Sequence, residues 1–195
     1  MSENLPGTQT NRDDKEKLQL QLLQINLNKS EKAHLDIINE RVSQNYNIIL
    51  IQEPHTTAFN VIRTPTNFRP VFPAHRLQNQ NQDQICSVIW VNRKLNTENW
   101  KALDIPGTNN ITAIQLKGPY RFISIFNIYN DCTHSRNKCI LQKYIQDHSN
   151  SKLATENHHM LWAGDFNRHH PLWDNDEDLL YTYSLNKPIN LPRGS

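Results

Sequence analysis

The chain has 195 residues, of which 36% are hydrophobic, and carries a net charge of +2 at neutral pH. This length suits a single domain with a sizeable core. A charge so near zero excludes a uniformly basic surface, so any affinity for phosphates must come from a local patch. The three cysteines are an odd number without CxxC spacing, which indicates free thiols rather than a disulfide framework or a zinc site.

The sequence contains neither an apolar segment long enough to span a bilayer nor a signal-peptide pattern at its N-terminus. We therefore expect an intracellular protein, nuclear or cytoplasmic, with no membrane partner. Residues 1–17 are polar and charged and lack apolar periodicity, which predicts a disordered tail. Residues 18–195 are expected to form one domain.

In the first half of that domain, residues 18–26 alternate apolar and polar side chains, a pattern that predicts a strand. Ser30 is suited to cap an amphipathic helix that runs over residues 32–43. Residues 47–54 form a β-branched run that ends in a charge, which is typical of a buried central strand. Residues 55–83 hold three prolines and a Gln/Asn tract, so we expect a loop there.

The second half continues the alternation of strands and helices. We expect strands at 85–91, 111–116, 121–129 and 160–163, a turn at 117–120, and helices at 135–148 and 174–184. Mixed strands and helices with an antiparallel hairpin in the middle predict an α/β fold, a layered sandwich.

The most informative motif is Asp165-Phe166-Asn167, which follows the apolar run 160–164, expected to be a buried strand. Strand side chains alternate between faces, so Asp165 and Asn167 are expected to point toward a site while Phe166 points into the core. Gly, Asp and Asn are also ordinary turn residues, so this triplet alone is equally compatible with a turn.

Three other expected strands also end in a polar group, namely Asn26, Glu53 and Tyr129. Together with Asp165 and Asn167, these side chains suit one divalent cation and one phosphodiester. Glu53 is then the metal ligand, Tyr129 and Asn167 hold phosphate oxygens, and Asp165 orients or deprotonates a water. Taken singly, Asn26 also fits a turn and Tyr129 a core-edge aromatic.

Magnesium suits these oxygen ligands. The adjacent His169 and His170 do not predict zinc, because neighbouring side chains on an extended segment face opposite ways and no third ligand is correctly spaced. Scattered arginines are a further candidate, as a phosphate-tracking rim: Arg63, Arg69, Arg76, Arg93 and Arg168.

The chain resembles the endonuclease/exonuclease/phosphatase superfamily of metal-dependent phosphodiesterases, and most closely the endonuclease domains of non-LTR (LINE-type) retrotransposons. The resemblance runs from about Leu18 to the C-terminus. Its motifs are Gln24-Ile25-Asn26-Leu27-Asn28, Ile49-Leu50-Ile51-Gln52-Glu53-Pro54, Phe126-Asn127-Ile128-Tyr129-Asn130, and the long and specific stretch GDFNRHHPLW at 164–173.

This resemblance implies a DNase I-like fold with two mixed β-sheets flanked by helices, and hydrolytic nicking of DNA that leaves a 3′-hydroxyl. The implied metal is Mg²⁺ or Mn²⁺, held by Glu53 together with Asn26 and Asp165. Tyr129 and Asn167 are implied to contact the scissile phosphate, and Asp165 to align the attacking water. The implied partners are DNA and, in a full-length element, a fused reverse transcriptase.

One departure from the family pattern also shapes the expectations. Family members continue to a further Asp and a terminal Asp-His pair, whereas this chain ends at Ser195 before either motif. We therefore expect a C-terminally truncated domain whose second sheet is incomplete, with impaired activity and self-association through an exposed sheet edge. The alternatives are an inactive remnant, or a relative that acts on other phosphoesters such as phosphoinositides or abasic-site DNA.

Overall fold

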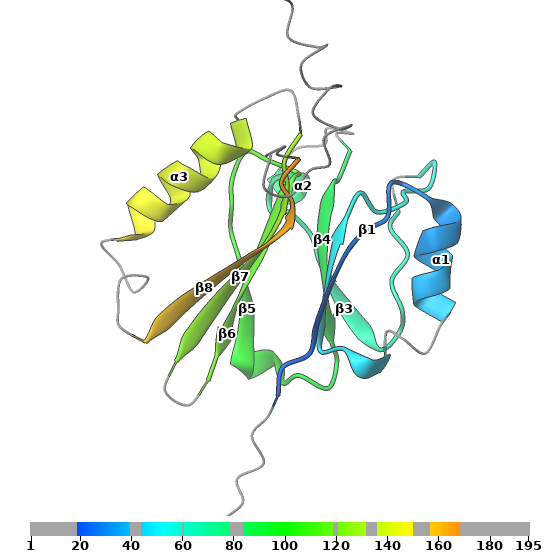
Figure 1. Ribbon diagram of the computed structural model, residues 1–195, viewed down its shortest axis with the longest axis horizontal. Helices are drawn as coiled ribbons and strands as arrows, with labels where there is room; N and C mark the ends of the chain where they lie inside the picture. Colours follow the sequence, from blue (N-terminus) through cyan, green and yellow to red (C-terminus); the bar gives the residue numbers. More distant parts are fainter. Residues whose placement is uncertain are drawn as a thin grey trace, which may run out of the picture.

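Two four-stranded β-sheets lie face to face in the computed structural model, with one long helix against the outer side of each (Figure 1). The structure describes residues 19–39, 44–59, 61–78, 84–118, 121–131, 136–149 and 157–167. The expected tail at 1–17, the expected helix at 174–184 and the motif residues 168–173 lie outside these residues. None of the helices in the described part is long and apolar enough to cross a membrane.

The first sheet has the strand order β1-β2-β4-β3 and combines parallel and antiparallel pairs. Strand β1 (Leu22–Asn26) runs parallel to β2 (Ile48–Gln52), and β4 (Ser87–Asn92) runs antiparallel to both β2 and β3 (Phe68–Val71). All five residues of β2 are buried, as expected for a central strand covered on both faces.

The second sheet has the order β5-β6-β7-β8. Strands β5 (Trp100–Leu103), β6 (Ile111–Lys117) and β7 (Phe122–Tyr129) form an antiparallel meander. Strand β8 (His158–Asp165) then lies parallel to β7. The predicted α/β sandwich of two mixed sheets is therefore confirmed.

Three apolar layers hold these elements together. Ile48, Leu50, Ile89, Ile114 and Ile125 fill the space between the sheets. Helix α1 (Glu31–Asn39) packs on the first sheet through a layer with the buried Trp90 at its centre, and α3 (Arg136–Ser149) packs on the second sheet around Phe126. As predicted, the Ser30 hydroxyl caps α1 by accepting a hydrogen bond from the Ala33 N–H at 3.2 Å.

The loop predicted over 55–83 is wrong in two places, because β3 and the short helix α2 (His75–Gln78) lie within it. Pro70 does not prevent strand formation, since among the described strands β3 lies at the edge of its sheet and pairs with β4 alone. Strand β5 and the 3₁₀ turn η2 (Thr97–Asn99) before it were also not predicted. A four-residue edge strand with one apolar residue at each end carries little periodic signal.

Candidate active site

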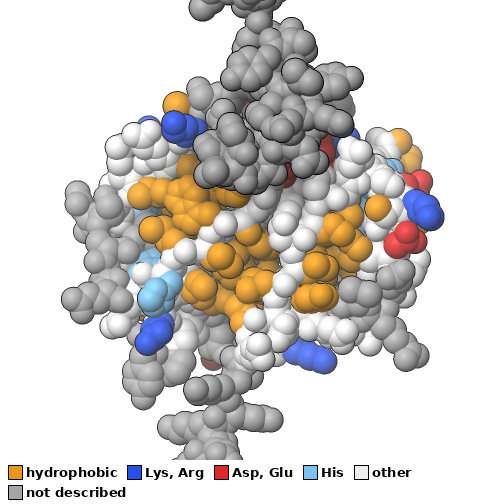
Figure 2. Space-filling model, in the orientation of Figure 1, with side chains coloured by type: hydrophobic (Ala, Val, Ile, Leu, Met, Phe, Trp, Pro, Cys, Tyr) orange, Lys and Arg blue, Asp and Glu red, His pale blue; other side chains and the backbone are white. Residues whose placement is uncertain are grey.

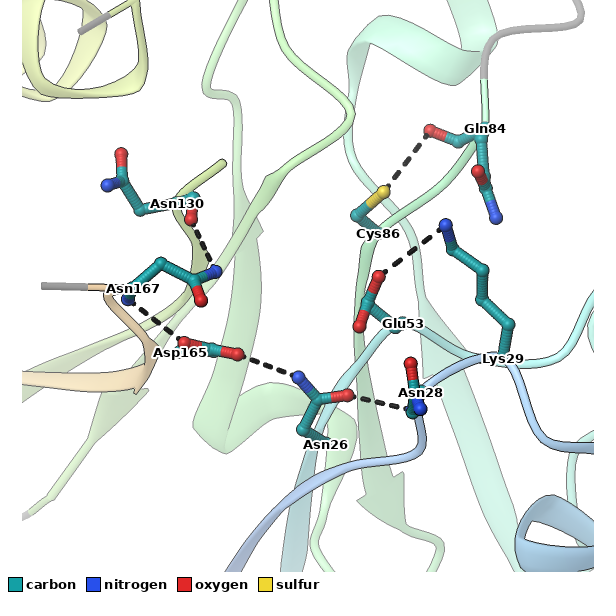
Figure 3. Close-up of polar contacts among 9 residues, drawn as sticks. All are labelled: Asn26, Asn28, Lys29, Glu53, Gln84, Cys86, Asn130, Asp165 and Asn167. Carbon is teal, nitrogen blue, oxygen red and sulfur yellow. Dashed lines mark hydrogen bonds and ion pairs between the residues drawn. The ribbon is translucent and has the colours of Figure 1, made fainter. Parts of the chain in front are cut away.

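The polar strand ends meet at one edge of the molecule. Parallel pairing puts the carboxyl ends of β1 and β2 side by side in the first sheet, and those of β7 and β8 in the second. The two pairs are joined by a hydrogen bond from Asn26 Nδ2 to Asp165 Oδ2, 2.8 Å long, between residues 139 positions apart (Figure 3). Asn26 and Asp165, predicted as site residues, are therefore in direct contact across the two sheets.

The Asn26 amide has only one orientation that satisfies both of its contacts. Its Oδ1 accepts a hydrogen bond from the Asn28 N–H at 2.8 Å, while its Nδ2 donates to Asp165. Turning the amide over would set two donors against each other at Asn28 and two acceptors at Asp165. The amide oxygen consequently lies on the side of the first sheet, and Figure 3 shows Asn26 between Asp165 and Glu53.

Asp165 is the last residue of β8 and is fixed by β7. Its carbonyl accepts a hydrogen bond from the Asn130 N–H at 2.8 Å, and its Oδ1 accepts one from the Asn167 N–H at 3.0 Å. The Asn167 side chain donates to the Asn130 carbonyl at 2.7 Å, and Asn130 in turn donates to the Phe166 carbonyl at 2.9 Å. Asn130, not predicted as a site residue, thus clamps the segment that carries Asp165 and Asn167.

Glu53 follows β2 and is buried, with 9% of its surface exposed. Its N–H donates to the Cys86 carbonyl and its own carbonyl accepts from the Lys29 N–H, both at 2.9 Å. The Lys29 ammonium lies 3.6 Å from Glu53 Oε1 and forms an ion pair with the carboxylate (Figure 3). Lys29 was not predicted as a site residue, because its contact with Glu53 depends on the backbone path rather than on a motif.

Unusual backbone geometry is concentrated at this site. In the described part of the chain, the non-glycine residues with positive φ are Asn28 (46°), Lys29 (58°), Glu53 (46°) and Asn167 (45°). Left-handed conformations cost an L-residue roughly 1–2 kcal/mol each. Such strain persists where the surrounding structure imposes it, and it is often found at functional sites.

Tyr129 connects the two halves of the site electrostatically. Burial raises the pKa of its phenol well above the usual value, and the negative charge of Glu53 and a hydrogen bond to that carboxylate raise it further. The charges of Cys86 and Asp165 act on the pKa in the same direction. Tyr129 is therefore a neutral hydrogen-bond donor near both carboxylates, and the structure brings it together with Glu53 and Asp165.

A buried polar network lies beneath these residues and was not predicted. The Asn127 side chain donates to the carbonyls of Ile51 (2.9 Å) and Val88 (3.0 Å) and accepts a hydrogen bond from Gln52 Nε2. The Ser87 hydroxyl donates to the Asn127 carbonyl at 2.9 Å. Gln52 precedes Glu53 and Asn127 lies two residues before Tyr129, so the network fixes the position of one strand end relative to the other. The sign of this network in the sequence is that Gln52 and Asn127, both amides, each lie within an otherwise apolar run.

Two expectations for the last strand are wrong. Phe166 does not point into the core but is 41% exposed, because it lines, with Trp162, the groove between α3 and β8. The strand itself is not buried, since Met160 and Trp162 are 43% and 39% exposed. In the part of the chain that the structure describes, β8 pairs with β7 alone, so it has the partial exposure of an edge strand.

Other histidines and arginines have structural contacts. His158 is the first residue of β8, and its Nε2 lies 2.8 Å from the Ser124 hydroxyl. Arg69 and Arg93 contact backbone carbonyls where β3 begins and β4 ends, at the opposite end of the sheet from Glu53. These two arginines therefore do not form the expected rim at the site.

The ligand set at the site fits magnesium better than zinc. Among the described residues, no group of three or more His, Cys, Asp or Glu side chains is placed to hold a metal ion. The site instead offers the Glu53 carboxylate, the Asn26 amide oxygen and, beside it, Asp165. Magnesium commonly takes one or two carboxylates and completes its shell with water and substrate oxygens.

The apolar groove next to the site lies between α3 and β8 and has a volume of about 470 Å³. Its lining includes Leu141, Ile145, Trp162 and Phe166, with Asn130 at its border. Figure 2 shows several hydrophobic patches on the face viewed there, separated by polar side chains and backbone. Glu53 and Asp165 are not among the residues that line the groove, so the candidate chemistry lies beside it rather than within it.

Comparisons with known proteins bear on the family and the fold of the chain. Residues 23–192 match the model of the endonuclease/exonuclease/phosphatase family. A similar solved structure is the endonuclease domain of TRAS1, a telomere-specific non-LTR retrotransposon, with 19% identity and a TM-score of 0.58. That match covers 86% of this chain and 70% of the TRAS1 domain.

A second similar structure is the AP endonuclease LMAP from Leishmania major, with 10% identity and a TM-score of 0.51. The match covers 75% of this chain but only 54% of the Leishmania enzyme, so the chain spans about half of that protein. No curated protein sequence matches the chain. Because the family model extends over nearly all of its residues, the chain belongs to the endonuclease/exonuclease/phosphatase family.

Proposed function

We propose that this domain is a metal-dependent phosphodiesterase that nicks DNA by hydrolysis and leaves a 3′-hydroxyl. The observation that carries the proposal is the hydrogen bond between Asn26 and Asp165, because it unites the polar ends of four strands from two sheets. Family membership supports phosphodiester chemistry, and the TRAS1 domain and LMAP, both endonucleases by name, support a nucleic-acid substrate.

Each predicted residue has a role that its contacts support. Glu53 and the Asn26 amide oxygen hold Mg²⁺ or Mn²⁺, with Asp165 adjacent. The bound cation supplies positive charge that neutralises the non-bridging phosphate oxygens. Asp165 is held by Asn26 and by the Asn167 N–H, and it orients the water that attacks phosphorus. The bond from phosphorus to the 3′-oxygen breaks, and this oxygen leaves as the 3′-hydroxyl.

Tyr129 and Asn167 contact the scissile phosphate. The raised pKa of Tyr129 keeps the phenol protonated. Its single O–H bonds the Glu53 carboxylate in the free protein and turns to a phosphate oxygen when substrate binds. The Asn167 amide uses one N–H on the Asn130 carbonyl and retains a second for the substrate. In a longer polypeptide that carries a reverse transcriptase, the new 3′-hydroxyl serves as the primer.

A plasmid-nicking assay tests the proposal. Conversion of supercoiled to open-circular DNA is measured with Mg²⁺ and with EDTA, and extension of the nicked product by a polymerase reports the 3′-hydroxyl. We expect EDTA to stop the reaction, and Glu53→Gln and Asp165→Asn to slow it by about 100-fold or more. The matched control is Glu31→Gln, which removes an exposed carboxylate on α1 that is paired with Arg63. Nicking that survives both site substitutions contradicts the proposal.

A second candidate is a remnant that binds DNA without cutting it. The observation in its favour is the ion pair between Lys29 and Glu53, in which an ammonium already neutralises the carboxylate. Duplex binding that persists without any nicking by the wild-type chain in Mg²⁺ or Mn²⁺ would favour this candidate. A panel of abasic-site DNA and phosphoinositides tests whether other phosphoesters are substrates.

A further inference from the structure

The ion pair between Lys29 and Glu53 is loose and unequally exposed. The Glu53 side chain is 12% exposed and the Lys29 side chain 50%, so the ammonium approaches the buried carboxylate from the solvent side. Their separation of 3.6 Å exceeds the 2.7–2.9 Å that is typical of a charge-assisted hydrogen bond. Lys29 therefore balances the charge of Glu53 without being locked to it.

The backbone of the 27–30 loop aims Lys29 at this position. The Leu27 N–H donates to the Gln52 carbonyl and the Lys29 N–H to the Glu53 carbonyl, both at 2.9 Å, so the loop runs along the end of β2. Consecutive left-handed conformations at Asn28 and Lys29 then turn the lysine side chain back over Glu53, as Figure 3 shows. The Asn26 amide oxygen, through the Asn28 N–H, holds this turn in place.

We infer that Lys29 is an internal counter-ion of Glu53 that a divalent cation displaces and that then contacts a phosphate of the bound nucleic acid. This inference rests on the function proposed above. A doubly charged cation at Glu53 repels the ammonium, and its half-exposed position leaves Lys29 free to turn outward. A DNA phosphate on the solvent side is the anion within reach of a long, flexible lysine side chain.

Two consequences separate this role from an ordinary surface charge. Removing the lysine charge should strengthen metal binding, because the cation no longer competes with an ammonium for Glu53. The same change should weaken DNA binding and reduce its dependence on salt, because one phosphate contact and its counter-ion release are lost.

The test uses the full 195-residue chain and its variants Lys29→Gln and Lys29→Arg. Lys94→Gln is the matched control: it removes the same charge from an exposed lysine just after β4, at the end of the first sheet that lies away from Glu53. Binding of Mn²⁺ without DNA is followed by the electron paramagnetic resonance signal of free Mn²⁺. Binding of a nuclease-resistant phosphorothioate duplex is followed by fluorescence anisotropy in Mn²⁺ over a series of KCl concentrations.

We expect Lys29→Gln to bind Mn²⁺ about twofold to fivefold more tightly than wild type, which is the range for a partly exposed ion pair. Its plot of log affinity against log salt should be shallower by about 1. Lys29→Arg and Lys94→Gln should resemble wild type in metal affinity. Unchanged or weaker Mn²⁺ binding by Lys29→Gln overturns the inference, and so does a wild-type salt slope.

The proposed function can fail separately. A wild-type chain that does not nick DNA contradicts the function, whereas the two binding titrations still decide the role of Lys29 without any reaction. A wild-type chain that binds neither Mn²⁺ nor duplex contradicts both. Thermal melting of each variant checks folding, and Lys29 is exposed enough for its replacement to leave the core intact.

Discussion

At Gly164 the strands β7 and β8 approach so closely that replacing this glycine by alanine, which adds one methyl group, tests their packing. Its φ is +140°, and a Cβ there would lie 1.9 Å from the Ile128 carbonyl oxygen. The Ile128 carbonyl carbon and nitrogen would each lie 2.8 Å away. Real Cβ atoms essentially never come within 3.0 Å of such atoms, so Gly164→Ala must separate the two strands by about 1 Å.

Two costs add in the Gly164→Ala variant. A sparsely populated backbone conformation costs an L-residue about 1–3 kcal/mol, and overpacking a tight contact costs about 1–3 kcal/mol more. The expected loss in the free energy of unfolding is therefore about 2–6 kcal/mol, a large share of the roughly 5–15 kcal/mol available to a typical domain. Asp165 follows directly, so the displacement should also disturb its hydrogen bond to Asn26 and lower the nicking rate.

Gly107→Ala is the control for this prediction. Gly107 also has positive φ, +79°, but its nearest neighbour to an added Cβ is the Ile140 Cδ1 atom at 3.9 Å. This variant should show the backbone strain without the steric clash. Urea unfolding followed by circular dichroism measures both variants. Equal losses of stability in the two would refute the reasoning, because the clash at Ile128 would then contribute nothing.

Three further predictions concern other parts of the molecule. Asn127→Ala should lower the free energy of unfolding by about 3–5 kcal/mol in urea titrations, because it leaves buried carbonyl partners on β2 and β4 unsatisfied. The control Asn96→Ala, at the exposed start of η2, should lower it by about 1 kcal/mol. Equal losses of stability in the two variants would contradict a stabilising role for the Asn127 network. Burial raises the pKa of the Cys86 thiol from 9.0 to about 11, so iodoacetamide at pH 8 should modify the exposed Cys139 well before Cys86, as peptide mass spectrometry can show. Because the pKa of this thiol is higher in the folded than in the unfolded state, its contribution to stability is present below pH 9 and is lost as the pH rises to about 11. The midpoint of urea unfolding should therefore decrease less between pH 9 and pH 11 in Cys86→Ser than in wild type. Finally, the chain should associate through β8 as its concentration rises, as sedimentation velocity can show, and Met160→Lys should reduce this association. A wild-type chain that stays monomeric at every concentration would contradict association through β8.

Local patterns predicted the central elements because burial leaves a strong signal in sequence. The apolar run of β2 and the alternating β6–β7 hairpin are examples, and their polar ends indicated the candidate site. The edge strands β3 and β5 were missed, since an edge tolerates Pro70 and needs little apolar surface.

The finer structure of the site depends on features that no short motif encodes. Phe166 was expected in the core by strand alternation, but it borders a groove together with Trp162 of β8, and both side chains remain exposed. Lys29 reaches Glu53 because Asn28 and Lys29 both adopt positive φ. Neither residue type has to adopt that conformation, so the sequence alone does not indicate it. The link from Asn127 to β2 and β4 joins separate sheets, and pairing of that kind is fixed by the tertiary structure.

The long sequence separation between Asn26 and Asp165 constrains when the site can form. During synthesis, Asn26 leaves the ribosome well before its partner, and the first sheet is complete once residue 92 has emerged. The contact between Asn26 and Asp165 nevertheless has to wait for β8, because that strand carries the Asp165 carboxylate. Contacts between distant parts of a chain slow folding through the entropy of closing the intervening loop. A nascent or prematurely terminated polypeptide that lacks residue 165 therefore cannot assemble this site.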